Sequence, residues 1–66
     1  MNESAYVSVR DASKMIGVGK DTLYKLAKEA KNNGFPGVKI GNKWFIHRDR
    51  IVVWMKEHEG REVIID

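Results

Sequence analysis

Apolar residues recur at helical spacing close to the start of the chain. Ala12, Met15 and Ile16 stand at positions i, i+3 and i+4, which places them on one face of a helix. Residues 8–11 have the serine-x-x-acid spacing in which the hydroxyl caps the first turn. Gly17 can adopt the left-handed conformation that ends a helix. The pattern therefore predicts a first helix of about two turns that begins near Val9.

A second and longer helix is predicted over residues 20–32. Gly19 can serve as its N-cap without a side-chain acceptor, and Gly34 and Pro36 close it. Its apolar stripe consists of Leu23, Leu26, Ala27 and Ala30. At 100° per residue, the opposite face carries Asp21, Tyr24, Lys25 and Lys28. One face is thus predicted to join the core and the other to be exposed and mostly basic.

Two β-prone runs, residues 38–40 and 44–46, are joined by the segment 41–43. Glycine followed by asparagine is a favoured pair in tight hairpins because both tolerate positive φ. A β-hairpin is therefore predicted. Its period-two alternation predicts that Val38, Ile40, Trp44 and Ile46 point one way. Lys39 and Phe45 are predicted to point the other way, with Lys43 at or beside the tip.

A third helix is predicted after Asp49 and before Gly60, because Ile51, Trp54 and Met55 share one helical face. The expected order is helix, helix, β-hairpin, helix around one small core. This is the α+β winged helix-turn-helix arrangement. Residues 1–66 are expected to form a single domain, with residues 59–66 as an extended tail that contains the apolar run 63–65.

Composition narrows the class of protein. Hydrophobic residues make up 42% and charged residues 32% of the 66 residues, which is ordinary for a globular protein and argues against a wholly disordered chain. The absence of cysteine excludes a disulfide framework and a thiolate zinc site. There is no apolar run long enough for a leader or a membrane span, so a cytoplasmic protein without a membrane partner is expected.

Charge is unevenly distributed along the chain. From Glu57 onward there are four acidic residues against Arg61, a net charge of −3, while the first 56 residues carry 11 basic and 5 acidic groups, a net charge of +6. A basic body of this kind can meet a polyanion. The acids at 57, 59 and 62 are expected to form a solvated end that repels DNA.

The two predicted helices on either side of residues 17–19 form a helix-turn-helix, in which the second helix can enter the major groove. Near the start of that helix, Lys20, Asp21 and Thr22 can reach base edges. Lys25 and Lys28 are placed for phosphates, and Tyr24 can bond a phosphate or stack on a sugar. For Asp21, stabilisation of the first helical turn is the alternative role.

The hairpin has the composition of a wing that touches the DNA backbone or the minor groove. Lys39, Asn42 and Lys43 stand toward its tip, and Gly41 would permit close approach. Lys14 and Arg48 are further candidates for contact with the backbone. Trp44 and Trp54 are assigned to the core rather than to base stacking.

The residues 6–55 resemble the excisionase-type winged helix-turn-helix family related to the MerR superfamily. The resemblance rests on Asp-Ala-Ser-Lys-Met-Ile-Gly-Val over residues 11–18, Asp-Thr-Leu-Tyr over 21–24, Val-Lys-Ile-Gly-Asn-Lys-Trp over 38–44, and the final helix ending in Trp-Met at 54–55. Two positions depart from the family pattern: Gly19 replaces the usual serine or threonine cap, and Phe45 stands where a polar residue is common.

The resemblance implies sequence-specific binding of double-stranded DNA. It further implies an excisionase, or recombination directionality factor, that shapes DNA for an integrase and binds beside neighbouring copies of itself. Small transcriptional regulators have the same shape, and both roles stay open. The tail is expected either to cover Phe45 within its own chain or to reach a neighbouring copy or an integrase; a frayed end is the alternative.

Two other classes of function compete with DNA binding. A protein-interaction module could use the same fold, although the basic face of the second helix argues against it. No enzyme is expected, because no nucleophile–base pair, phosphate loop or metal set is visible. His47 and His58 lack the spacing of metal ligands, so neither a metal nor another cofactor, nor a small-molecule substrate, is predicted.

Overall fold

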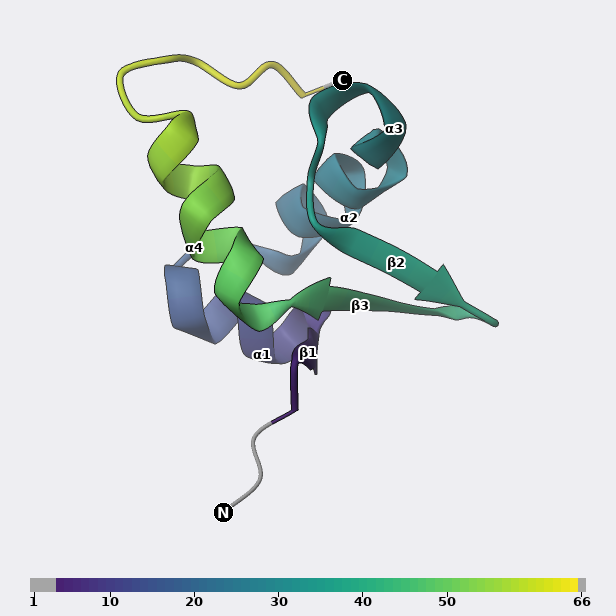
Figure 1. Ribbon diagram of the computed structural model, residues 1–66. Coiled ribbons are helices and arrows are strands. Elements are labelled where there is room, and N and C mark those ends of the chain that lie inside the picture. Colours follow the sequence, from purple (N-terminus) through teal and green to yellow (C-terminus); the bar gives the residue numbers. More distant parts are fainter. Residues whose placement is uncertain (1–3, 66) are drawn as a thin grey trace.

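Three short strands form one antiparallel sheet, and the helices pack against one of its faces (Figure 1). The computed structural model describes residues 4–65. In chain order the elements are β1 (Tyr6–Ser8), α1 (Val9–Ile16), α2 (Lys20–Lys28), α3 (Ala30–Asn33), β2 (Gly37–Ile40), β3 (Lys43–His47) and α4 (Arg48–Glu57). The predicted α+β class is therefore confirmed. The predicted order was incomplete, because it lacked the strand β1 and the short helix α3.

Strand β1 pairs with β3. Because β2 pairs with the other edge of β3, β3 lies at the centre of the sheet. Tyr6 lies opposite His47, and Val7 lies opposite Ile46. Where β3 continues into α4, the Arg48 amide donates a hydrogen bond of 2.8 Å to the Ala5 carbonyl. Three residues are too few for a visible alternation, so the sequence carried no signal for this strand.

Helix α1 follows the predicted capping pattern. The Ser8 hydroxyl accepts a hydrogen bond of 3.1 Å from the Asp11 amide, and Gly17 ends the helix in the left-handed conformation with φ of 73°. The side chain of Ser13 then donates to the Val18 carbonyl at 2.6 Å, which ties the turn to the helix. Only Met15 departs from expectation, since its side chain is 45% exposed.

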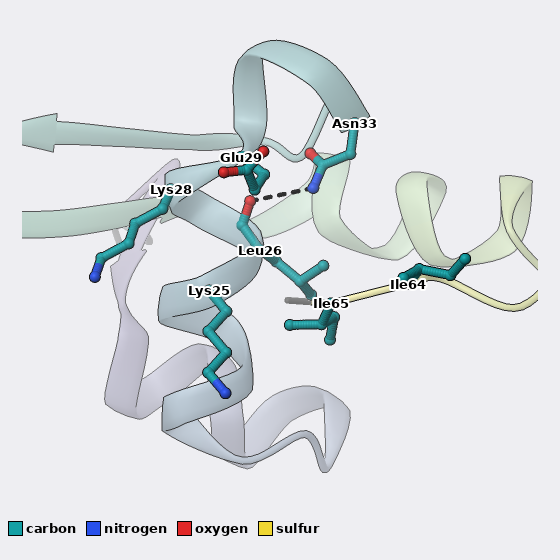
Figure 2. Close-up of a pocket in the computed structure, with 7 residues that line it drawn as sticks. All are labelled: Lys25, Leu26, Lys28, Glu29, Asn33, Ile64 and Ile65. Atoms are coloured by element: carbon teal, nitrogen blue, oxygen red, sulfur yellow. Dashed lines mark hydrogen bonds between the residues drawn. The ribbon is translucent and has the colours of Figure 1, made fainter.

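The predicted second helix is interrupted at Glu29, which adopts φ of −100° and ψ of 17°. The side chain of Asn33 explains the interruption. Its amide nitrogen donates to the Leu26 carbonyl at 3.2 Å (Figure 2), and its Oδ1 accepts from the Phe35 amide at 2.8 Å. A side chain thus satisfies a carbonyl that the next helical turn would have used. Because the bond spans seven residues, local propensity did not predict it.

The core lies between the sheet and the helices. Its buried members come from all four longer elements and from the segment before β2: Val9, Ala12, Leu23, Leu26, Ala27, Phe35, Ile46, Ile51 and Trp54. Trp54 joins α4 to the segment after α3, because its Nε1 donates to the Asn33 carbonyl at 2.9 Å and its ring meets Phe35 edge-on at 5.2 Å. Trp44 is half-buried and packs against this cluster. The core assignment of both tryptophans is confirmed.

The hairpin faces were wrongly predicted for Val38, Lys39 and Ile40. A tight turn pairs Ile40 with Lys43 and Val38 with Phe45, and residues directly opposite one another in a ladder share a face. Val38 and Ile40 therefore lie with Phe45 on the outer face of the sheet, while Ile46 lies on the inner face. The connection comprises only Gly41, with φ of 63°, and Asn42, whereas the sequence had suggested residues 41–43. One residue of difference in the loop reverses the relative faces of the two strands.

The tail lies against the helices and not over Phe45. Val63 packs on the core, and Ile64 and Ile65 lie beside Lys25 and Leu26 of α2 (Figure 2). The tail leaves α4 at the end remote from β3 and runs toward α3 (Figure 1). That path overturns the expectation that the tail covers Phe45.

Substitution of Val63 tests the packing of the tail. Val63→Asp should lower the free energy of unfolding by about 1 to 3 kcal/mol, because it places an unpaired carboxylate against the core. Ile64→Asp is the matched control, since the Ile64 side chain is 82% exposed, and it should change stability by less than about 0.5 kcal/mol. Urea unfolding followed by circular dichroism measures both. Equal effects of the two variants would show that the tail does not pack as described.

Candidate nucleic-acid interface

Helices α1 and α2 meet across residues 17–19 and leave one face of α2 uncovered. Leu23, Leu26 and Ala27 are buried beneath α2. The opposite face is exposed, as predicted; it carries Asp21, Tyr24, Lys25 and Lys28. At the start of the helix Lys20 is exposed and Thr22 is half-buried. The helix that the sequence predicts to enter the major groove therefore has its polar face exposed.

The turn between the two helices is held without help from an N-cap side chain. Gly19 has φ of −60° and ψ of 150° and makes no side-chain hydrogen bond to the helix. Its carbonyl accepts from the Leu23 amide at 3.1 Å, which begins the helical ladder. An ideal Cβ at Gly19 would meet no atom within 4 Å. The departure from the usual serine or threonine is therefore not imposed by crowding within this chain.

A notch of about 290 Å³ forms where α1, α2 and the hairpin meet. It is lined by Ser8, Val9, Arg10, Tyr24, Asn42, Lys43, Trp44 and Phe45. The structure thus brings Tyr24 of α2 together with Asn42 and Lys43 of the hairpin. The notch has a guanidinium, an ammonium, a phenol and an amide around it, and all four can donate hydrogen bonds to phosphate oxygens.

Arg10 is a candidate that sequence reasoning missed. It stands in the first turn of α1, and its side chain is exposed and lines the notch. Lys14 is four residues later, so the two cations share one face of the helix. This i, i+4 spacing of basic residues was readable in the sequence. The proximity of Arg10 to the hairpin was not, because it depends on the pairing of β1 with β3.

The remaining wing candidates lie on both faces of the hairpin. Lys39 is opposite Trp44 and therefore on the inner face, whereas Lys43 is opposite Ile40 on the outer face. Gly41 forms the tip, and an ideal Cβ there would meet nothing within 4 Å. Residues 30–48 contain no aspartate or glutamate, so the charged side chains of the hairpin and its flanking segments are all cationic.

Two groups of predicted residues lie away from the notch. Lys25 and Lys28 line a second hollow, of about 210 Å³, beside Ile64 and Ile65 of the tail (Figure 2). Arg48 lies at the start of α4, with Nε 3.8 Å from Asp49 Oδ1. Neither the hollow beside the tail nor the Arg48–Asp49 ion pair contains a residue of the hairpin tip. The candidate surface therefore extends along α2, and the notch meets it at Tyr24, the middle residue of the helix.

Both histidines have structural contacts. His47 Nδ1 accepts from the Arg50 amide at 3.1 Å and caps α4, and its ring meets Tyr6 edge-on at 5.0 Å. His58 Nδ1 lies 2.8 Å from the Trp54 carbonyl, and the two rings are 4.1 Å apart. Among residues 4–65 no group of three or more His, Asp or Glu side chains could hold a metal ion. Over the same residues no helix could span a membrane.

Comparisons with known proteins place the chain in a family. A search of curated proteins found no significant relative, and a search of solved structures found none either. The family of helix-turn-helix domains matches residues 6–59, from the first residue of β1 to just beyond α4. Helix-turn-helix domains bind DNA through their second helix, and they are typically non-enzymatic. Because the match covers most of the 66 residues, the chain belongs to this family of helix-turn-helix domains, which implies that it binds DNA.

Proposed function

We propose that this chain is a sequence-specific binder of double-stranded DNA in which α2 enters the major groove and the hairpin lies on the adjacent backbone. The observation that carries the proposal is the notch, because it places Tyr24 of α2 beside Asn42 and Lys43 of the hairpin. A duplex that contacted the exposed face of α2 would meet the hairpin cations at the same time. Simultaneous contacts of this kind position a recognition helix on its site.

The proposed roles follow from position on α2 and on the hairpin. Lys20, Asp21 and Thr22, in the first turn of α2, are assigned to base edges, because recognition helices present their N-terminal residues to the groove. The backbone contacts are assigned to Arg10, Lys14, Tyr24, Lys25, Lys28, Lys39, Asn42, Lys43 and Arg48. Gly41 lets the backbone of the turn approach the duplex, since no side chain projects there.

Selection from a random-sequence pool of duplexes tests sequence-specific binding. The protein should enrich a common motif, and fluorescence anisotropy should then show tighter binding to the enriched duplex than to a shuffled one. Each mismatched base pair should weaken binding by about 1 to 3 kcal/mol. Equal affinity for enriched and shuffled duplexes would contradict sequence-specific recognition.

For the biological role we propose an excisionase that shapes DNA for an integrase. The motifs over residues 11–18 and 38–44 support this role through their resemblance to excisionases. If an integrase gene lies beside the gene of this protein, incubation of the protein with that integrase and a plasmid carrying both attachment sites should yield excised circles. A transcriptional regulator would instead bind upstream of a gene and change reporter expression without stimulating excision.

Substitutions on α2 and on the hairpin should affect binding differently. Lys20→Ala or Thr22→Ala should change the preference between related sites, because each hydrogen bond to a base edge is worth about 1 to 3 kcal/mol of discrimination. Lys43→Ala should weaken binding about equally on all duplexes, because a phosphate contact carries no sequence information. Anisotropy titrations on the enriched duplex and its single-base variants measure both effects. A change of site preference by Lys43→Ala alone would assign reading to the hairpin.

A further inference from the structure

The tip of the hairpin presents an isoleucine to solvent. Ile40 is the last residue of β2, lies opposite Lys43 across the Gly41–Asn42 turn, and is 64% exposed. Among the large apolar side chains of the described helices and strands, it is the most exposed. The hairpin projects from the rest of the domain (Figure 1), and Ile40 stands at its far end, beside the tight turn.

Ile40 is not required by the core. It lies at the rim of a shallow apolar hollow on the outer face of the sheet, together with Tyr6, Val38 and Phe45. The helices cover the opposite face, where Ile46 is fully buried. A polar side chain at position 40 would therefore leave the core intact, and the exposed isoleucine is available to a ligand.

The surroundings of Ile40 select a nucleic acid as that ligand. Lys39 precedes it and Lys43 faces it, one on each face of the hairpin, so the two cations can reach phosphates on both sides of a groove. Asn42 at the turn can bond the acceptors on the floor of a minor groove. The absence of acidic residues over 30–48 removes repulsion from phosphates. A cationic tip with an apolar centre matches side chains that wedge between base pairs.

The position of the notch indicates which groove the tip would meet. It joins the hairpin to Tyr24 of α2 through Arg10, Asn42 and Lys43. If α2 occupied a major groove, backbone phosphates would lie beside the notch, and the tip of the hairpin would reach the next groove along the duplex. That groove is the minor groove, about 6 Å wide, which is too narrow for the whole two-stranded hairpin but can admit side chains at its tip.

We infer that Ile40 enters the minor groove as an apolar wedge, partly unstacks one base step and so bends the duplex. The inference rests on the proposed binding of DNA by α2. It adds a determinant of specificity, because pyrimidine–purine steps unstack more easily than other steps. The enriched motif should therefore contain such a step at a fixed distance from the bases that α2 contacts.

Local unstacking and overall bending can be measured on one duplex. A 2-aminopurine base is moved stepwise through the enriched site, and donor and acceptor dyes on the two ends report the bend. The wild-type protein should raise 2-aminopurine fluorescence at one step at least about twofold and bend the duplex by about 20 to 90°. Ile40→Ser should lose more than half of both signals, and Ile40→Leu should retain them.

Val53→Ser is the matched control, because Val53 is 53% exposed on α4, an element that does not line the notch; it should retain both signals. The three variants should unfold at the same temperature as the wild type. Binding of the enriched duplex without either signal would overturn the wedge and leave the proposed function standing. Failure of the wild type to bind any duplex would instead contradict the proposed function. If Ile40→Ser kept both signals but reduced self-association in sedimentation, the outer face would contact another copy and the wedge would be wrong.

Discussion

Replacement of Trp54 by alanine is expected to leave the domain unfolded at room temperature. Trp54 is 6% exposed, contacts Phe35 and His58, and holds the Asn33 carbonyl through its indole N–H. Loss of a buried tryptophan costs about 3 to 5 kcal/mol. A core in a chain of this size supplies about that much in total. Far-ultraviolet circular dichroism should therefore show loss of helix without denaturant.

Two further variants separate the contributions of Trp54. Trp54→Phe keeps an aromatic ring but removes the hydrogen bond to Asn33, and it should lower the free energy of unfolding by about 1 to 3 kcal/mol. Val53→Ala, on the exposed side of the same helix, should change it by less than about 0.5 kcal/mol. Urea titrations of all three give the comparison. Cooperative unfolding of Trp54→Ala at the wild-type urea concentration would disprove the central role of the indole.

Binding to duplex DNA is expected to weaken steeply as salt is raised. If about four to six phosphates are contacted by the cations of α2, the hairpin and α1, the slope of log K against log salt should be roughly −4 to −5. Affinity should then fall by about 10² to 10³ between 50 and 200 mM salt. Fluorescence anisotropy on one duplex over that range measures the slope. A slope near zero would contradict binding to the phosphate backbone.

The contribution of Arg10 can be read from the same slope. Arg10→Ala should reduce the magnitude of the slope by about 0.9, which corresponds to one phosphate contact. Lys56→Ala is the control, because Lys56 is exposed in the last turn of α4 and does not line the notch. An unchanged slope in Arg10→Ala would remove the notch from the proposed interface, while α2 could still read the groove.

Features that depend on neighbouring residues were predictable from the sequence. The cap at Ser8, the left-handed end at Gly17 and the buried stripe of α2 all involve residues within one or two helical turns. The exposed face of α2, with Tyr24 and Lys25, follows from the same periodicity. Helical geometry fixes which side chains share a face without reference to the rest of the chain.

Features that depend on distant residues required the tertiary structure. The end of α2 at Lys28 depends on the Asn33 side chain, and the strand β1 depends on a partner far along the chain, with Ser8 opposite Phe45. For the hairpin, alternation within each strand was clear, but the faces of the two strands relative to one another were set by the turn. The alternation of apolar and polar residues does not show whether two paired strands present their apolar residues to the same face.

The candidate interface divides in the same way. The exposed, mostly basic face of the second helix and the cationic hairpin that follows it were predictable from the sequence, because charge and periodicity are local properties. The position of Arg10 beside Tyr24 and Lys43 in one notch, and of Ile40 on the outer face of the hairpin, became visible in the three-dimensional fold. Both results follow from the antiparallel pairing of β3 with its two neighbours, which brings separated segments together and fixes which side chains each face presents.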